Sequence, residues 1–327
     1  MPLVVGLDLH LRQSYGTVME ESGRIVKQGK FETSREKLAE FLKDVPKGTR
    51  VALEAQGFCW PWIDYLEELG YKPLLVNPMK AKQRAEDLKT DKVDSEILAH
   101  LTRMNWLPTV YVPPREIRDL KNLLRHRFYL RMVSTALKNR TLSEFRKRDL
   151  PFDFDLGTKK GRRFAREMGT WEIQQNVEIL ELLEEKMSAV ELSLAARYGN
   201  LEPVRLLQTI PGIGVLTALG IYAEIGDIRR FPNSDRLAHY AGLVPRVSQS
   251  GGQIWHGRET KGNKWLKWML IEAAWMHLLH NPNGRLARVY QQALQRKGKG
   301  GKAIKVVARK LVNIIWQVWT KGEPFRE

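Results

Sequence analysis

The stretch LVVGLDLH, residues 3–10, decides how the first part of this 327-residue chain folds. Its short run of apolar side chains is typical of a buried strand. Asp8 lies within that run. A carboxylate in a buried strand destabilises the fold unless a partner compensates its charge. Asp8 is therefore the first candidate for a functional residue.

Three further carboxylates occur in settings that would bring them toward the first. Glu54 lies in RVALEAQG, residues 50–57, a second apolar run that predicts a strand. Asp91 and Asp94 lie in KTDKVDSEILAHL, residues 89–101, which predicts a helix whose residues three apart share one face. Taken singly, each of these acids more often caps a helix or faces solvent.

Four converging carboxylates would repel one another, and a bound divalent cation would remove that repulsion. Oxygen ligands are those that Mg²⁺ prefers, and Mn²⁺ accepts them as well. We therefore predict a two-metal site for phosphoryl transfer, formed by Asp8, Glu54, Asp91 and Asp94.

The first 110 residues alternate segments with strand and helix patterns. Three strands, a helix, a strand, a helix, a strand and a helix follow one another, which is the order of the ribonuclease H-like fold. In that order the first and fourth strands lie side by side, which would place Asp8 beside Glu54. We expect strands at 3–10, 14–21, 24–32, 50–57 and 72–78, and helices at 34–45, 60–69 and 79–104.

Prolines 108, 113 and 114 mark a boundary, after which helical patterns dominate. Residues 115–150 predict one long basic helix, and residues 151–170 a basic linker that contains Pro and Gly. From residue 171 to 197, apolar side chains recur every three or four positions, as in a coiled-coil seam. We expect a helical hairpin, whose apolar stripes serve internal packing, a dimer or a nucleic-acid arm.

A different region begins near residue 201. The segment Pro211–Gly214 lies between two apolar helices and resembles a helix-hairpin-helix turn. Gly212 and Gly214 would let the backbone approach a ligand, and free N–H groups at the second helix could bind a phosphate. Such a turn contacts the nucleic-acid backbone rather than the bases.

The remaining segments of this region are strongly basic. Residues 242–264 are expected to form an exposed loop, and residues 285–310 hold nine Lys/Arg and no acid. We expect KGKGGK, residues 297–302, to be flexible and the last helix to pack on the core. The predicted domains are a mixed α/β domain at 1–112, a coiled-coil region at 113–200 and a mainly helical domain at 201–327.

The overall charge points to a polyanionic partner. There are 54 Lys+Arg against 37 Asp+Glu, a formal net charge of +17, and nucleic acid is the first candidate. The single cysteine excludes a disulfide framework or a Cys-based zinc site within the chain. We find neither a secretory leader nor a run of about 18 apolar residues, and expect a cytoplasmic protein with no membrane partner.

Several motifs, taken in order, resemble those of the IS-one-ten family of insertion-sequence recombinases, which also includes the Piv-type invertases. The resemblance covers nearly the whole chain, and only the middle helices lack a diagnostic motif. The matching segments are GLDLH, LEAQG, KTDKVDSEILA, IPGIGVLTA, AEIGDIRRF, LAHYAGLVPRVSQSGG and GRETKGNKWL.

The resemblance implies an α/β plus α architecture with a distinct mechanism. The first domain would be RuvC-like, with the four carboxylates as a DEDD site for Mg²⁺ or Mn²⁺. The last would be a transposase domain with a nucleophilic serine. A structured noncoding bridge RNA would pair with donor and target DNA, and subunits would form dimers to tetramers in which one subunit's serine domain completes another's metal site. The reaction would pass through a phosphoserine link and a Holliday junction.

Two serines, Ser248 and Ser250, occur in PRVSQSGG, residues 245–252, and the family pattern of a serine just before glycine favours Ser250. A serine is a weak nucleophile without a base, metal or cation beside it. The sequence shows no dedicated base, so the metal site would activate it. Predicted nucleic-acid contacts are Gly212, Gly214, Arg246, Arg258 and Lys261; His10 and His256 are candidate neighbours of the site, although such histidines are more often structural or solvent-facing.

Three other interpretations stay open. The chain could be a junction nuclease that uses only the metal site, a site-specific invertase without guide RNA, or a nucleic-acid-binding protein without catalysis. A junction nuclease leaves Ser250 and the last domain without a role, and a binding protein without catalysis leaves the buried carboxylates unexplained. The residues alone do not separate transposition from inversion.

Overall fold

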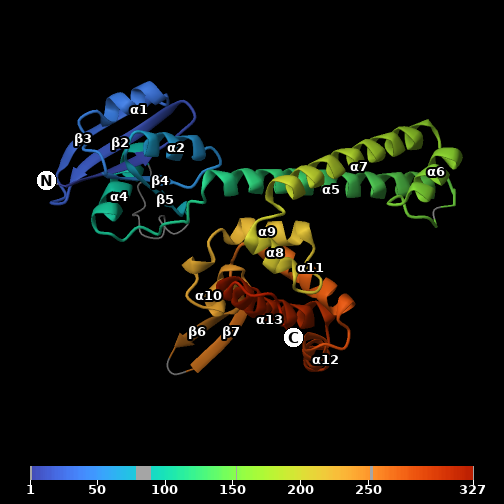
Figure 1. Cartoon of the computed structure of the whole chain (residues 1–327). Coiled ribbons are helices and arrows are strands. Elements are labelled where there is room, and N and C mark those ends of the chain that lie inside the picture. Colours follow the sequence, from blue (N-terminus) through green and yellow to red (C-terminus); the bar gives the residue numbers. More distant parts are fainter. Residues whose placement is uncertain (1, 79–89, 152, 251–252, 327) are drawn as a thin grey trace. The chain divides into compact units, whose positions relative to one another are not determined.

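The computed structural model describes residues 2–78, 90–151, 153–250 and 253–326. The chain divides into two compact units, Met1–Val112 and Pro113–Glu327 (Figure 1). Across the described ranges, every helix is either too short or too polar to cross a membrane.

The first unit is built on one mixed five-stranded sheet with the order β3-β2-β1-β4-β5. The central strand β1 pairs antiparallel with β2 and parallel with β4. The prediction that the first and fourth strands lie side by side is therefore confirmed. The strands are β1 (Leu3–Asp8), β2 (Gln13–Glu20), β3 (Ile25–Glu32), β4 (Arg50–Glu54) and β5 (Lys72–Val76).

Alternate residues of β1 serve the two faces of the sheet, as the strand period of two requires. Val5 and Leu7 pack in a core with α1 (Arg35–Leu42) and α2 (Trp60–Glu68). On the opposite face Val4 packs against the helix that precedes the end of the unit. Because both faces are covered, the carboxyl end of β1 is buried.

That helix, α4 (Asp91–Arg103), lies against β1 at a glycine. A Cβ added at Gly6 would lie 2.1 Å from the Ser95 carbonyl oxygen and 2.6 Å from the Ala99 nitrogen, so only glycine permits this approach. The hydroxyls of Thr17 and Ser95 also lie 2.8 Å apart in the buried interface.

The helix predicted at 79–104 is described only from its last part, because residues 79–89 lie outside the described residues. The hydroxyl of Thr90 accepts a hydrogen bond from the Val93 N–H and caps α4. The first turn of α4 thus begins at Asp91, one turn before the contact with Gly6.

The second unit begins with two long helices, α5 (Arg115–Lys147) and α7 (Trp171–Tyr198), which pack as the predicted helical hairpin (Figure 1). Ile173, Val177 and Leu180 are buried in its core. The predicted seam is confirmed because these positions face α5 and α6 rather than solvent.

The prediction of a linker at 151–170 is wrong, because this segment contains α6 (Lys159–Met168). Thr158 caps the helix by accepting from the Gly161 N–H at 3.0 Å. Arg162 is buried, donates to the carbonyls of Leu156 and Gly157, and pairs with Glu184 on α7. The basic composition of this segment therefore suggested an exposed linker, although the segment forms a helix in which Arg162 is buried.

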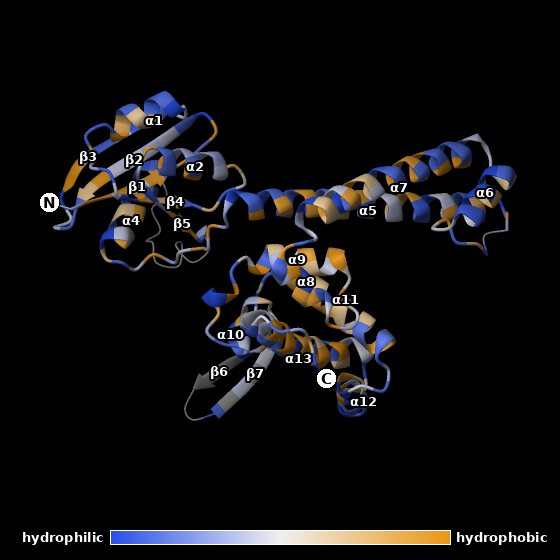
Figure 2. Cartoon of the chain, in the orientation of Figure 1, coloured by the Kyte–Doolittle hydropathy of each residue, from blue (hydrophilic) through white to orange (hydrophobic). Residues whose placement is uncertain are grey.

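The remaining helices surround the largest hydrophobic core of the chain. Figure 2 shows hydrophobic stretches along the last of them, α13, among hydrophilic ones, and this helix packs against α8, α10, α11 and α12, as predicted for the last helix. These elements are α8 (Glu202–Gln208), α9 (Val215–Ile225), the 3₁₀ helix η1 (Ile228–Arg230), α10 (Ser234–Tyr240), α11 (Lys264–His280), α12 (Arg285–Lys297) and α13 (Gly300–Lys321).

The KGKGGK segment differs from the expectation of a flexible stretch. Gly298 adopts a left-handed conformation (φ 61°) and ends α12, and α13 begins at Gly300. The glycine can adopt this conformation without steric strain, so the segment forms a short turn between two helices.

Residues 242–264 were expected to form a loop, and this prediction is wrong. They contain an antiparallel hairpin of β6 (Pro245–Ser250) and β7 (Gln253–Glu259). Ser250 pairs with Gln253, and the two glycines between them lie outside the described residues. A Gly-Gly pair between two alternating segments is a hairpin signal, and the Gly and Ser content of the segment hid it.

Candidate functional site

Asp8 and Glu54 end two neighbouring parallel strands. Leu7 pairs with Leu53, so the two acids occupy the next position on β1 and β4. Residues in register on parallel strands share a face of the sheet, and here that is the face covered by α4. Asp8 is only 5% exposed and Glu54 is half-buried.

The first turn of α4 and His10, two residues beyond the end of β1, complete a cluster around Asp8. His10 Nε2 lies 3.0 Å from Asp8 Oδ2 and 3.5 Å from Asp91 Oδ1. Each of these three residues offers a ligand atom within 4.8 Å of the others, which makes them the potential metal-binding group among the described residues. His10 is therefore confirmed as a neighbour of the site.

Burial and the neighbouring acids outweigh the effect of His10 on the pKa of Asp8. Burial raises the pKa of Asp8 because its charged form loses contact with water, whereas the adjacent His10 lowers it. The negative charges of Asp94 and Asp91 raise the Asp8 pKa further, so both acids act on this carboxyl. Of the predicted quartet, the structure thus brings Asp8, Asp91 and Asp94 together and puts Glu54 at the next strand end.

These residues fit a divalent cation. Carboxylate oxygens suit Mg²⁺, and the imidazole of His10 is a ligand that Mn²⁺ and other transition metals accept. A cation beside Asp8 would reverse the effect of burial, since it stabilises the charged carboxylate.

An open hollow adjoins Asp91 and His10 on the surface of the sheet. Arg12 and Lys30 line it, and both are exposed. Cations beside a carboxylate cluster are suited to the phosphates of a nucleic-acid backbone.

The helix-hairpin-helix glycines have different settings. Gly212 has φ 85°, and a Cβ there would lie 2.3 Å from the His277 nitrogen on α11. Its close approach in the structure is therefore to α11, and its contact with nucleic acid stays a prediction. Gly214 is exposed, with no atom within 4 Å of an added Cβ, and it precedes α9.

The β6–β7 hairpin separates the residues predicted around the serine. Ser250 is the last residue of β6, whereas Arg246 lies near the other end of that strand and is exposed. Lys261 follows β7 beyond Glu259, which pairs with Pro245. In one subunit Lys261 and Ser250 are thus at opposite ends of the hairpin. The side chains of Ser248, Ser250, His256 and Arg258 lie outside what the structure describes.

Comparison with protein families gives two matches. The family described as "Transposase IS116/IS110/IS902 family" matches residues 204–291. A transposase model named for the DEDD residues and IS110 matches residues 5–146. The first match includes the hairpin and the second includes all four predicted carboxylates.

Similar proteins span nearly the whole chain. The transposase for insertion sequence element IS1111A of Coxiella burnetii is 29% identical over 90% of this chain and 84% of its own length. The transposase for IS1328 of Yersinia enterocolitica is 25% identical over 98% of both chains. The pilin gene-inverting protein of Moraxella bovis is 37% identical over 37% of this chain and 38% of its own.

A solved structure of T. thermophilus RuvC with a Holliday junction substrate also aligns with part of the chain. It is 16% identical, covers 34% of this chain and 100% of that one, and has a TM-score of 0.27. A likeness of that size carries no argument about this protein.

Proposed function

The chain belongs to the IS110 (IS-one-ten) family of transposases, enzymes that cut and rejoin DNA, and from this we propose that it is an RNA-guided DNA recombinase of an insertion sequence. The observation that carries the proposal is the buried carboxylate Asp8 at the end of β1, beside Asp91, Asp94 and Glu54. A buried carboxylate beside other carboxylates destabilises the fold unless it binds a divalent cation, which can in turn contact a phosphate.

We infer that the first unit is a RuvC-like nuclease domain whose metal ligands are Asp8, Glu54, Asp91 and Asp94. Bound Mg²⁺ or Mn²⁺ would stabilise the charge that develops on the transferred phosphoryl group. His10, whose Nε2 lies 3.0 Å from Asp8 Oδ2, would hold that carboxylate in place. The ends of β1 and β4 are fixed by the sheet, so these ligands would need little rearrangement.

In the second unit, Ser250 would be the nucleophile. Its Oγ would form a bond to the phosphorus of a phosphodiester, and the bond from phosphorus to one sugar oxygen would break. The serine loses its proton and the leaving sugar oxygen gains one, so nothing is oxidised or reduced. Arg246 and Arg258 lie near the base of the same hairpin, away from Ser250, and would contact phosphates farther along the bound strand.

The partners we propose are donor DNA, target DNA and a structured bridge RNA. The net charge of +17 supports a polyanionic partner. Ile179, Leu182 and Leu192 are exposed on α7, outside its packing with α5, and would support association of subunits into dimers or tetramers. In such an assembly the hairpin of one subunit would complete the acidic site of another.

A reconstituted recombination assay tests the proposal. Purified protein, donor DNA and target DNA are mixed with and without RNA transcribed from the noncoding DNA that flanks the gene. We expect recombination only with the RNA and with Mg²⁺ or Mn²⁺. Asp8→Ala should lower the rate by at least ~100-fold and leave nucleic-acid binding intact, whereas Glu20→Ala, at the end of β2, should retain the rate.

A second function, site-specific inversion without guide RNA, is favoured by the similarity to the pilin gene-inverting protein. The same assay separates the two. Recombination that proceeds with DNA and metal alone supports inversion without a guide. Wild-type rates in Asp8→Ala would contradict both.

A further inference from the structure

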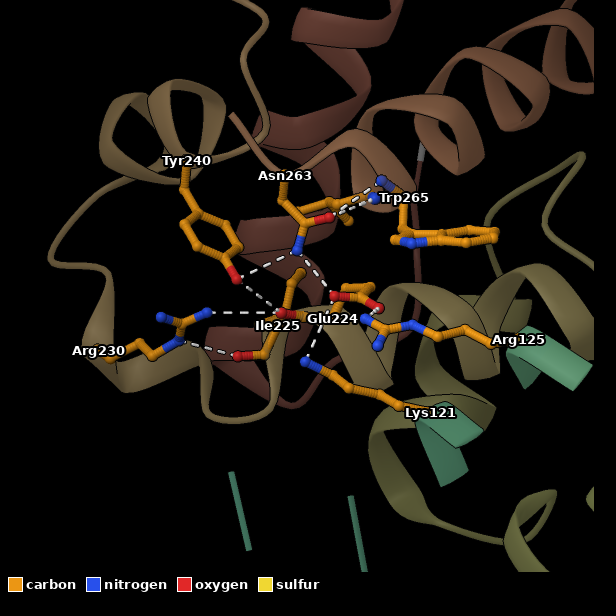
Figure 3. Close-up of polar contacts among 9 residues, drawn as sticks. Lys121, Arg125, Glu224, Ile225, Arg230, Tyr240, Asn263 and Trp265 are labelled. Atoms are coloured by element: carbon orange, nitrogen blue, oxygen red, sulfur yellow. Dashed lines mark hydrogen bonds and ion pairs between the residues drawn. The ribbon is translucent and has the colours of Figure 1, made fainter. Parts of the chain in front are cut away.

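A buried carboxylate in the second unit has no part in the proposed chemistry. Glu224 on α9 is 5% exposed and accepts contacts from three sides (Figure 3). Lys121 Nζ lies 3.3 Å from its Oε2, and Arg125 Nη2 lies 3.4 Å from its Oε1. The side-chain amide of Asn263 donates to Oε2 at 2.7 Å.

Asn263 is held in one orientation because both ends of its amide are used. Its Oδ1 accepts hydrogen bonds from the N–H groups of Trp265 and Leu266 and so caps α11. Its Nδ2 therefore faces Glu224, and it also donates to the Tyr240 hydroxyl at 3.2 Å. The Tyr240 hydroxyl in turn donates to the Glu224 carbonyl at 3.3 Å.

These residues lie where the β6–β7 hairpin leaves the helical core. The Asn263 N–H donates to the Tyr240 carbonyl at 2.8 Å, and the Thr260 N–H donates to the Val244 carbonyl at 2.9 Å. A Cβ added at Gly262 would lie 2.3 Å from the Gly242 nitrogen, so the two backbones are in contact. The segment that leaves β7 is thus joined directly to the segment that enters β6.

We infer that Glu224, Asn263 and Tyr240 are positioning residues that set the direction of the β6–β7 hairpin relative to the helical core. The inference rests on the proposed role of Ser250, which would then meet its phosphodiester at a place determined by contacts at the base of the hairpin. A two-stranded hairpin has little stability of its own, so its direction must come from where it is anchored.

The position of Ser250 depends strongly on the orientation of the hairpin where it joins the helical core. From Pro245 to Ser250 the strand advances ~17 Å. A tilt of about 10° at the base would therefore move Ser250 by about 3 Å. A misplacement of ~1 Å can lower a rate by about 100-fold.

Stability alone is a weak reason for this network. A buried ion pair is often no more stabilising than apolar side chains of the same volume, because its charges lose their hydration. The network can instead fix an orientation, because Lys121 and Arg125 connect α5 to the same carboxylate that Asn263 contacts. The base of the hairpin is thereby tied to α9, α10, α11 and α5 at one point.

Asn263→Ser is the variant that isolates the link. Serine is also a good helix cap, so α11 keeps its cap, but the side-chain hydrogen bonds to the Glu224 carboxylate and the Tyr240 hydroxyl are lost. Asn233→Ser is the matched control, because Asn233 caps α10 by accepting from the Arg236 N–H and has no contact with Glu224 among those described. Tyr240→Phe, which removes one hydroxyl, is a second and milder variant.

The first measurement is a distance between spin labels on the full chain. Labels are attached at Gln253→Cys, at the end of the hairpin, and Lys310→Cys on α13; both positions are exposed and the native Cys59 is buried. We expect a narrow distance distribution in the parent and in Asn233→Ser. Asn263→Ser and, to a smaller extent, Tyr240→Phe should broaden or shift it.

The second measurement is the rate at which unlabelled protein becomes covalently attached to saturating DNA, with RNA and Mg²⁺ present. We expect Asn263→Ser to lower that rate by on the order of 100-fold with unchanged DNA affinity. An unchanged distance distribution overturns the inference, whatever the rate. If the parent forms no adduct but Asn263→Ser broadens the distribution, the positioning role stands and the proposed role of Ser250 fails.

Discussion

The acidic centre and the serine hairpin hold their residues by opposite means. The carboxylates lie at the ends of strands inside a sheet that is covered on both faces, where Gly6 lets α4 approach β1 directly. The serine lies at the end of a two-stranded hairpin whose described contacts with the helical core are at its base. A site built into a sheet depends on packing around it, whereas a site on a hairpin depends on contacts far from the reacting atom.

Among the tests of this comparison, we expect the largest effect from replacing the proposed nucleophile, Ser250. Ser250→Ala should abolish the covalent adduct, because no other atom at that position can form the bond to phosphorus. Ser248→Ala, two residues earlier on β6, should retain it. Trapping the protein on DNA and mapping the attached peptide checks both, and an adduct that maps to Ser248 would move the assignment by one strand repeat.

A glycine tests the packing of the sheet. Gly6→Ala should lower the free energy of unfolding of the first unit by about 1–3 kcal/mol, because its Cβ would collide with the backbone of α4. Gly29→Ala on β3 is the control, since a Cβ there meets no atom within 4 Å. Urea unfolding of both variants measures the difference, and equal values would mean that α4 does not need this contact.

The pH dependence of stability tests the charge at the acidic centre. Burial raises the pKa of Asp8, so its protonated form favours the folded state, and this contribution is lost as pH rises through the folded pKa. Without metal, Asp8→Asn should therefore be more stable than the parent at neutral pH. Adding Mg²⁺ should stabilise the parent but not Asp8→Asn, as thermal unfolding with and without EDTA would show.

The smallest expected effect is on the salt dependence of nucleic-acid binding, and it is spread over many basic residues. Exchanging Arg288, Arg296 and Lys299 for Gln should reduce the slope of log K against log salt by ~1 for each lost phosphate contact. All three are exposed at or near α12. Arg12→Gln and Lys30→Gln beside the acidic centre make the same test in the first unit, and a slope changed only by them would move the nucleic-acid surface there.

Sequence reasoning succeeded where local pattern and fold agree. The apolar runs of β1 and β4 predicted adjacent strands, and an i,i+3 pair at the start of α4 predicted two acids near Asp8. The strand and helix patterns are local, and the order of these elements, which matches a known fold, predicted the long-range pairing of β1 with β4. His10 could be identified only as a candidate neighbour, because one histidine after a strand is equally compatible with a solvent-facing role.

The sequence predictions failed where the amino-acid composition of a segment suggested a different structure from the one that it adopts. In α6, Arg162 is an internal residue whose charge is met by Glu184 and by two carbonyls, and no periodicity of apolar residues reveals it. In β6 and β7 the glycines and serines suggested a loop. The close packing of Gly212 on α11 was also not expected. Arg162 and Gly212 contact Glu184 and His277, which lie far away in the sequence, whereas the pairing of β6 with β7 is local.

The contact between Gly242 and Gly262 brings the two ends of the hairpin together where it joins the helical core. Because both strands leave the core at one point, residues can be inserted in β6 and β7 without disturbing the helices behind them. Two residues added to each strand would carry Ser250 about 7 Å farther out on the same face. One added to each would turn it to the opposite face. With Ser250 as the proposed nucleophile, the length of the hairpin would then set how far the enzyme reaches toward the strands that it joins.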